Sequence, residues 1–309
     1  MREIPFTVLR GFVMGAADIV PGVSGGTVAL VFAMYDRLIE AVRTGSSALG
    51  HFLKLDVRGG LELLKQVEWV FLIPLLAGIG LAIATLSSVI ERLLHDHPVQ
   101  MAGLFLGLVA GSVVVAWQLL ERRDLMRLAV LIGVGLITFV LLGLREGTSE
   151  ESVQGVADPS LLAFFGAGAI AICAMILPGI SGSFILVTLG MYSAVLGAVN
   201  DRDVAAVAAV ALGCVLGLAL FSQVLHWALN QHYNTVMAGL IGLMLGSLRV
   251  LWPWPGGVDS TALGSPSGPV LVPVALAVGG LVLVVGINEL AKWLEGRDTE
   301  GEREELRSV

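Results

Sequence analysis

Two short segments combine a Pro-Gly pair with a serine and further glycines, and both interrupt apolar runs. A Pro-Gly pair breaks a helix, which leaves backbone carbonyls unpaired before the break and backbone N–H groups unpaired after it. Glycine lets a ligand approach those N–H groups closely, and helix N-termini attract anions, above all phosphate. The candidate anion-binding residues are therefore Gly22, Val23, Ser24, Gly25, Gly26 and Thr27 in the first segment and Gly179, Ile180, Ser181, Gly182 and Ser183 in the second.

Two ionisable residues accompany the first segment and have no counterpart beside the second. Arg10 aligns with Ala167, and Asp18 aligns with Met175. A charge inside an apolar run is costly and points to function. We expect Arg10 to contact a bound phosphate from the side, with extension of its side chain to the headgroup region as the alternative. We expect Asp18 to bind a coupling ion, H⁺ or Na⁺, with an ion pair to Arg10 or a hydrogen bond to the break as the alternative.

A catalytic serine is the competing interpretation of the same segments. Gly22-Val-Ser-Gly-Gly26 fits the Gly-x-Ser-x-Gly pattern and resembles the serine motif of intramembrane rhomboid-type proteases. The Gly-x-Ser-x-Gly elbow requires a strand–turn–helix, and a serine nucleophile requires a general base. All five histidines lie at or beyond the ends of the apolar runs. We therefore expect no catalytic residue, no bound metal and no cofactor other than the coupling ion, and an intramembrane hydrolase is the least favoured function.

Composition decides the environment of these segments. The chain has 309 residues, of which 56% are hydrophobic and 14% charged, and its mean hydropathy is +0.88. These values exclude a soluble globule and a disordered chain, and the net charge of −7 gives no reason to expect nucleic-acid binding. A membrane-spanning helix needs about 20 mostly apolar residues. Six runs approach or exceed that length: Trp69–Ile90, Val99–Leu120, Leu125–Leu144, Val204–Leu229, Thr235–Leu251 and Val270–Leu290.

The two Pro-Gly segments belong to an internal repeat. They lie in apolar regions at about residues 5–39 and 160–199, which match at an offset of 157 as far as Met-Tyr pairs at 34–35 and 191–192. Residues 101–104 also match residues 237–240 at an offset of 136, and His97, Gly107 and Gly111 match His232, Gly242 and Gly246 at an offset of 135. A shared Pro-Gly-x-Ser-Gly core with a downstream Met-Tyr exceeds chance similarity, so the chain consists of two related halves.

The distribution of Lys and Arg favours inverted halves. If each broken region enters and leaves on one face, as a re-entrant hairpin, each half holds three spans and the halves are inverted. This topology places 14 Lys and Arg on one side and 4 on the other, whereas a single crossing of each broken region gives 10 against 8. Because cytoplasmic loops carry the positive excess, the hairpin topology is preferred and both termini are predicted to be cytoplasmic.

These observations predict an all-α integral membrane protein of two inverted repeats, each with one re-entrant helical hairpin and three transmembrane helices. The first repeat covers residues 1–150, with its hairpin at about 5–39, a surface segment at 40–68 and three spans. The second repeat covers residues 151–294, with its hairpin at about 160–199. Residues 295–309 are expected to form a cytoplasmic tail.

The first motif also resembles a known family. Gly11-Phe-Val-Met-Gly-Ala-Ala-Asp-Ile-Val-Pro-Gly-Val-Ser-Gly-Gly-Thr27, followed by Met34-Tyr35 and Leu38-Ile39, closely resembles the signature of bacterial proteins long labelled domain of unknown function 368. Leu177-Pro-Gly-Ile-Ser-Gly182 and the segment ending in Gly-Ser247 fit the same pattern. The resemblance covers nearly the whole chain, and the family is read as polyprenyl-phosphate transporters of the PopT type.

The resemblance implies a substrate and a location. It implies flipping of undecaprenyl phosphate across the bacterial cytoplasmic membrane, so that this lipid carrier of peptidoglycan precursors is recycled. The phosphate would bind at the Pro-Gly-x-Ser-Gly tips and the isoprenoid tail would remain in lipid. A transporter of a small soluble anion is the alternative, since it differs only in whether the cavity opens sideways to lipid. The residues leave open whether the protein forms a homo-oligomer.

Overall fold

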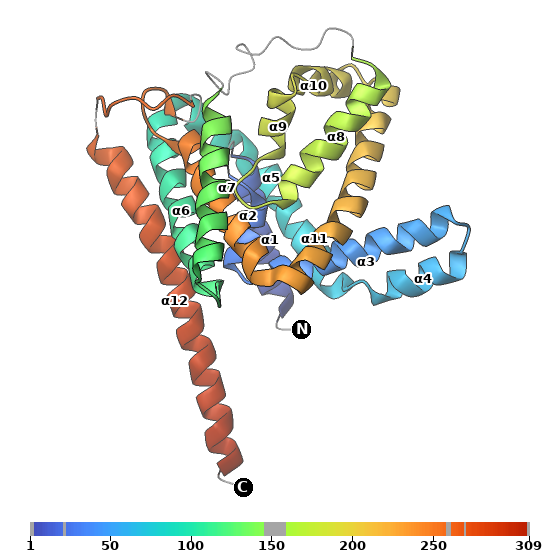
Figure 1. Ribbon diagram of the computed structural model, residues 1–309, viewed down its shortest axis with the longest axis horizontal. Coiled ribbons are helices and arrows are strands. Elements are labelled where there is room, and N and C mark those ends of the chain that lie inside the picture. Colours follow the sequence, from blue (N-terminus) through green and yellow to red (C-terminus); the bar gives the residue numbers. More distant parts are fainter. Residues whose placement is uncertain (1–2, 21–22, 145–158, 258–260, 269, 308–309) are drawn as a thin grey trace.

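The computed structural model describes residues 3–20, 23–144, 159–257, 261–268 and 270–307, and every element among them is helical (Figure 1). The predicted all-helical fold is thereby confirmed. In chain order the elements are α1 (Glu3–Asp18), α2 (Gly25–Val31), α3 (Tyr35–Leu53), α4 (Val57–Gln66), α5 (Trp69–Asp96), α6 (Pro98–Leu119), α7 (Leu125–Gly143), α8 (Leu161–Ile176), α9 (Gly182–Thr188), α10 (Tyr192–Asn200), α11 (Val204–Ser247), the 3₁₀ turn η2 (Leu248–Leu251) and α12 (Leu271–Arg307).

Short polar residues set where several of these helices begin. Asp56, Asp124, Ser160 and Asp203 precede α4, α7, α8 and α11, and the side chain of each accepts a hydrogen bond from a backbone N–H two or three residues later. Such N-caps satisfy donors that have no partner within the helix. Polar loop residues therefore start the apolar helices at defined positions.

The predicted spans correspond to long apolar helices. α5, α6, α7, α11 and α12 are each long and apolar enough to cross a membrane, and α9 with α10 pass the same test as a pair bent by 109°. The two predicted runs at 204–229 and 235–251 lie on α11, whose backbone leaves the helical conformation at His232. In Figure 1 the two arms of α11 form a V at this point. The chain is therefore a multi-pass membrane protein.

Glycines let α1 pack closely on α5. A Cβ atom on Gly11 of α1 would overlap the carbonyl oxygen of Leu75, and a Cβ atom on Gly78 of α5 would overlap that of Val8. Close backbone approach through small residues is the usual means by which membrane helices associate, because lipid supplies no hydrophobic force between them. Neither glycine could be replaced by a residue with a Cβ atom unless the two helices moved apart.

The same contact recurs between α8 and the first arm of α11. A Cβ atom on Gly168 would overlap the carbonyl oxygen of Val210, and one on Gly213 would overlap that of Phe165. Residues of α8 are offset by 157 from their counterparts in α1, and residues of α11 are offset by 135 from theirs in α5. The offsets of the sequence repeat therefore relate these two helix pairs residue by residue.

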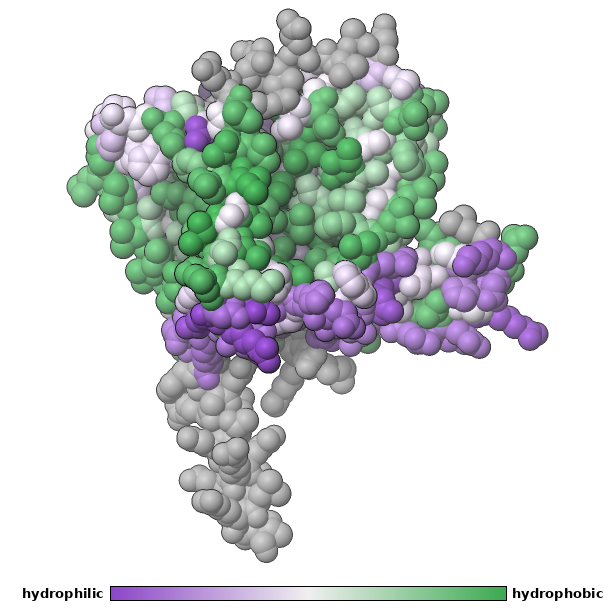
Figure 2. All heavy atoms as spheres, viewed as in Figure 1, coloured by the Kyte–Doolittle hydropathy of each residue, from purple (hydrophilic) through white to green (hydrophobic). Residues whose placement is uncertain are grey.

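The faces of the bundle differ in polarity. Figure 2 shows a broad apolar band with hydrophilic residues gathered below it. The start of α1, the α3–α4 pair and the end of α12 lie on this lower side, whereas α10 lies at the top (Figure 1). α3 continues unbroken from Tyr35 to Leu53, across the predicted boundary between the first hairpin and the surface segment. The tail expected at 295–309 continues α12 as a helix to Arg307.

Candidate functional site

Two helix–break–helix segments, residues 5–39 with α1 and α2 and residues 160–199 with α8 and α9, are here called the first and second hairpins. They contact each other at their breaks, here called the tips. The Ser24 hydroxyl lies 3.2 Å from the carbonyl oxygens of Met175 and Leu177, and the Tyr35 hydroxyl donates to the carbonyl oxygen of Ile176 at 3.2 Å. These carbonyls end α8, where the Pro-Gly break removes their helical partners. Polar groups of the first hairpin therefore donate to carbonyls at the second break, where helical partners are missing.

A second set of contacts packs the tips without space for side chains. The backbone N–H of Gly179 donates to the Thr27 hydroxyl at 3.0 Å. A Cβ atom on Gly26 would lie 2.6 Å from the carbonyl oxygen of Ile176. Gly179 has a φ of +88°, and a Cβ atom there would lie 2.8 Å from the Cα of Met244 in α11. The absence of a side chain at Gly26 thus lets the two tips pack together, and its absence at Gly179 lets the second tip pack against α11.

Three N–H groups of the first tip, those of Gly25, Gly26 and Thr27, are bonded within the protein. The N–H of Gly25 donates to the Asp18 carboxylate at 2.6 Å, and the N–H of Gly26 donates to the Ser24 hydroxyl at 3.1 Å. The N–H of Thr27 donates to the Ser24 carbonyl at 2.9 Å. Asp18 therefore occupies the position in which an external anion would meet Gly25. Its side chain makes the hydrogen bond to the tip that was one of the two alternatives to binding a coupling ion.

The second tip is built differently despite its matching sequence. Ser181, which precedes α9, makes no side-chain cap hydrogen bond, and its hydroxyl lies 2.8 Å from that of Ser183. The N–H of Ile180 donates to the carbonyl oxygen of Leu177 at 3.4 Å. A Cβ atom on Gly182 would lie 3.1 Å from the flexible side chain of Met175. Neither a serine cap nor a carboxylate engages the first turn of α9 in the way that Ser24 and Asp18 engage α2.

The remaining predicted residues lie around the first tip. The guanidinium of Arg10 lies 5.9 Å from the ring centroid of Phe32, just after α2, while Asp18 bonds to Gly25. Val23 is buried in the core. Gly22 lies outside the described residues. Among the residues that the structure does describe, no group of three or more His, Cys, Asp or Glu side chains could hold a metal ion.

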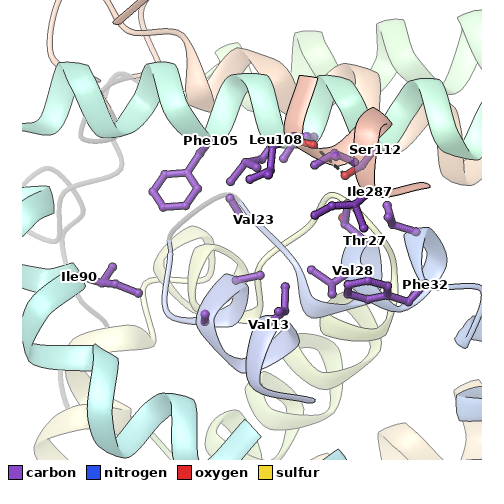
Figure 3. Close-up of a pocket in the computed structure, with 16 residues that line it drawn as sticks. Val13, Val23, Thr27, Val28, Phe32, Ile90, Phe105, Leu108, Ser112 and Ile287 are labelled. Atoms are coloured by element: carbon purple, nitrogen blue, oxygen red, sulfur yellow. Dashed lines mark hydrogen bonds between the residues drawn. The ribbon is translucent and has the colours of Figure 1, made fainter. Parts of the chain in front are cut away.

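An apolar cavity of about 240 Å³ adjoins the first tip. Val23 and Thr27 of the tip line it, together with residues of α1, α5, α6 and α12, including Phe105 and Ile287 (Figure 3). Sequence reasoning missed this cavity and the Tyr35 hydroxyl. A signal existed for Tyr35, since the Met-Tyr pair is repeated and a buried Tyr hydroxyl requires a partner. Apolar periodicity carries no signal for a cavity.

Replacing the two equivalent serines should have unequal effects on stability. Ser24→Ala removes the cap of α2 and the bond to the second hairpin, so we expect the free energy of unfolding to fall by about 2 kcal/mol. Ser181→Ala removes only the pair with Ser183 and should cost about 1 kcal/mol or less. Unfolding in detergent micelles measures both values. Equal losses would contradict the tip-to-tip role of Ser24.

Comparisons with known proteins identify the family of the chain. The model of the VCA0040-like, undecaprenyl phosphate translocase-like family matches residues 14–264. A Vibrio cholerae protein named polyprenyl-phosphate transporter is 41% identical over 248 residues, which cover 80% of this chain and 77% of that protein. A Staphylococcus aureus protein of the same name is 27% identical over 256 residues, covering 80% and 85%. No solved structure matches the chain significantly. The chain belongs to the undecaprenyl phosphate translocase-like family.

Proposed function

We propose that the protein transports polyprenyl phosphate by flipping undecaprenyl phosphate across the bacterial cytoplasmic membrane, so that the lipid carrier is recycled. Membership of the family and the names of its two relatives support this class of substrate. The observation that carries the proposal is the contact of two polar, glycine-rich tips inside an apolar bundle, with an apolar cavity at their side. A phosphate with a long hydrocarbon tail matches both features, because its phosphate suits the polar tips and its tail suits the apolar cavity.

In this proposal the phosphate binds at the tips. Because Asp18 holds the N–H of Gly25, the phosphate reaches the first tip only when the carboxylate is protonated or moves away. The same event would couple transport to H⁺ or Na⁺. Ser181, Gly182 and Ser183 offer the second half of the site, and Arg10 contacts the phosphate from the side.

The cavity supports a lipid over a small soluble anion. Val13 of α1 and Leu283 and Ile287 of α12 line it and are 39%, 55% and 44% exposed. Because exposed apolar side chains of a membrane protein face lipid, their exposure supports a cavity that opens sideways into the membrane. A soluble anion would require a polar path to the tips instead.

We further propose that the halves are inverted repeats with re-entrant hairpins, and that both termini are cytoplasmic. α1 begins and α12 ends on the same side of the bundle, whereas the second hairpin, from α8 to α10, begins and ends on the other side (Figure 1). The residues His97, between α5 and α6, and His232, at the break of α11, match at the offset of 135 and share a similar non-helical backbone. Interrupted helices at corresponding positions of inverted halves characterise transporter sites.

Reconstitution of the purified protein tests the function. Liposomes that contain fluorescent polyprenyl phosphate are exposed to a membrane-impermeant quencher. We expect the inner-leaflet lipid to become accessible much faster than in protein-free liposomes, and inorganic phosphate in the medium not to be taken up. Uptake of phosphate without flipping of the lipid would instead identify a transporter of a small soluble anion.

A further inference from the structure

The cavity beside the first tip is suited to hydrocarbon and not to water. Thr27 and Ser112 contribute hydroxyls to its lining, and both are engaged in the protein, Thr27 with the N–H of Gly179 and Ser112 with the Leu108 carbonyl at 2.8 Å. A buried water needs two to four polar partners, and cavities lined by apolar groups stay dry. The cavity therefore favours an apolar occupant.

Its volume sets the size of that occupant. An engineered apolar cavity of about 150 Å³ accommodates benzene, which has six carbon atoms. By that proportion a cavity of about 240 Å³ has room for roughly ten carbon atoms, which equals two isoprene units.

Its position links the occupant to the phosphate site. Val23 and Thr27, at the tip, lie at the cavity wall, and Phe32, over which Arg10 is placed, lies at one end of it (Figure 3). A chain within the cavity would thus have a phosphate at its head close to the tip and to Arg10, while its remainder would leave between α1 and α12 into lipid.

We propose that this cavity binds the isoprene units nearest the phosphate, about two of them, and so selects polyprenyl phosphates from other anionic lipids. This inference rests on the proposed function. In a polyprenyl phosphate a single chain begins directly at the phosphate oxygen. In phosphatidic acid a glycerol and two ester groups lie between the phosphate and the hydrocarbon. Burial of these polar groups in an apolar cavity whose two hydroxyls are already engaged is unfavourable.

A matched pair of substitutions tests the inference. Val28 of α2 lines the cavity, whereas Val282 of α12 is 60% exposed and does not line it. Val28→Phe narrows the cavity, and Val282→Phe makes the same change on the lipid-facing surface. Competition against labelled polyprenyl phosphate is measured with geranyl phosphate, which has two isoprene units, and with phosphatidic acid and inorganic phosphate. We expect Val28→Phe to lower the affinity for geranyl phosphate about tenfold or more. Val282→Phe should bind geranyl phosphate with the affinity of wild type.

Two further outcomes are decisive. Inorganic phosphate should displace the labelled polyprenyl phosphate equally well from wild type and from Val28→Phe. Phosphatidic acid should displace it only weakly from either protein. If wild type binds polyprenyl phosphate, and Val28→Phe binds geranyl phosphate as tightly as wild type does, the cavity is not the isoprene site and this inference is wrong. If wild type binds no polyprenyl phosphate at all, the proposed function itself is wrong.

Cross-linking provides a test that does not depend on the folding of a variant. A polyprenyl phosphate with a photoreactive diazirine on its second isoprene unit is irradiated with the wild-type protein. We expect the label on peptides of α1, α2, α6 or α12 that line the cavity. Labelling confined to α8, α9 and the first arm of α11 would overturn the assignment.

Discussion

Gly26→Val is expected to reduce transport of polyprenyl phosphate at least a hundredfold. Even the Cβ atom of a new side chain would lie 2.6 Å from the carbonyl oxygen of Ile176, which is backbone and cannot move aside as a flexible side chain would. The two tips would have to separate, and the bonds that Ser24 and Thr27 make to the second hairpin would be lost. Overpacking of this kind costs about 1–3 kcal/mol. Flipping in liposomes and unfolding in detergent measure the two effects.

Gly166 provides the matched control for this substitution. It lies in α8 of the second hairpin, and a Cβ atom there would meet no atom within 4 Å. Gly166→Val should therefore retain wild-type transport and stability within a factor of about two, since it makes the same change of residue in open space. Wild-type activity of Gly26→Val would show that close contact between the tips is not needed for transport.

Asp18→Asn is expected to lower ion-driven accumulation of the substrate about tenfold to a hundredfold while leaving phosphate binding intact. The Asn side-chain oxygen can still accept the N–H of Gly25, so the tip keeps its shape and only the charge is lost. The contact between the Asp18 carboxylate and the coupling ion would be lost, and a charged contact worth about 1.5–3 kcal/mol corresponds to that range. Accumulation under imposed H⁺ and Na⁺ gradients, together with equilibrium binding on the same purified protein, measures the two properties separately.

Asp18→Ala separates the charge from the hydrogen bond. It removes both, so it should lose accumulation and also about 1–3 kcal/mol of stability, because the buried N–H of Gly25 is left without an acceptor. If Asp18→Asn accumulates substrate like wild type under both gradients and only Asp18→Ala is impaired, Asp18 has a structural role at the tip and no part in coupling.

Properties that depend on local composition followed from the sequence. The long apolar helices lie where runs of sufficient length occur, because the cost of exposing polar groups to lipid is set by each run itself. The breaks after Asp18 and Ile176 follow from Pro-Gly pairs, which interrupt a helix whatever surrounds them. The repeat could be detected because both halves retain the same residues at these breaks. The family followed from the same residues.

The contacts of the candidate site were decided only by tertiary structure. Ser24 and Ser181 occupy equivalent positions in the repeat, yet Ser24 caps a helix and contacts the opposite hairpin while Ser181 pairs with Ser183. The difference arises because Ser24 takes the carbonyls of Met175 and Leu177 as partners from a segment distant in sequence, and no local pattern encodes which carbonyl lies within 3.2 Å. The cavity depends likewise on how α1, α2, α6 and α12 fail to fill the space between them, which is a property of packing among helices and not of any one of them.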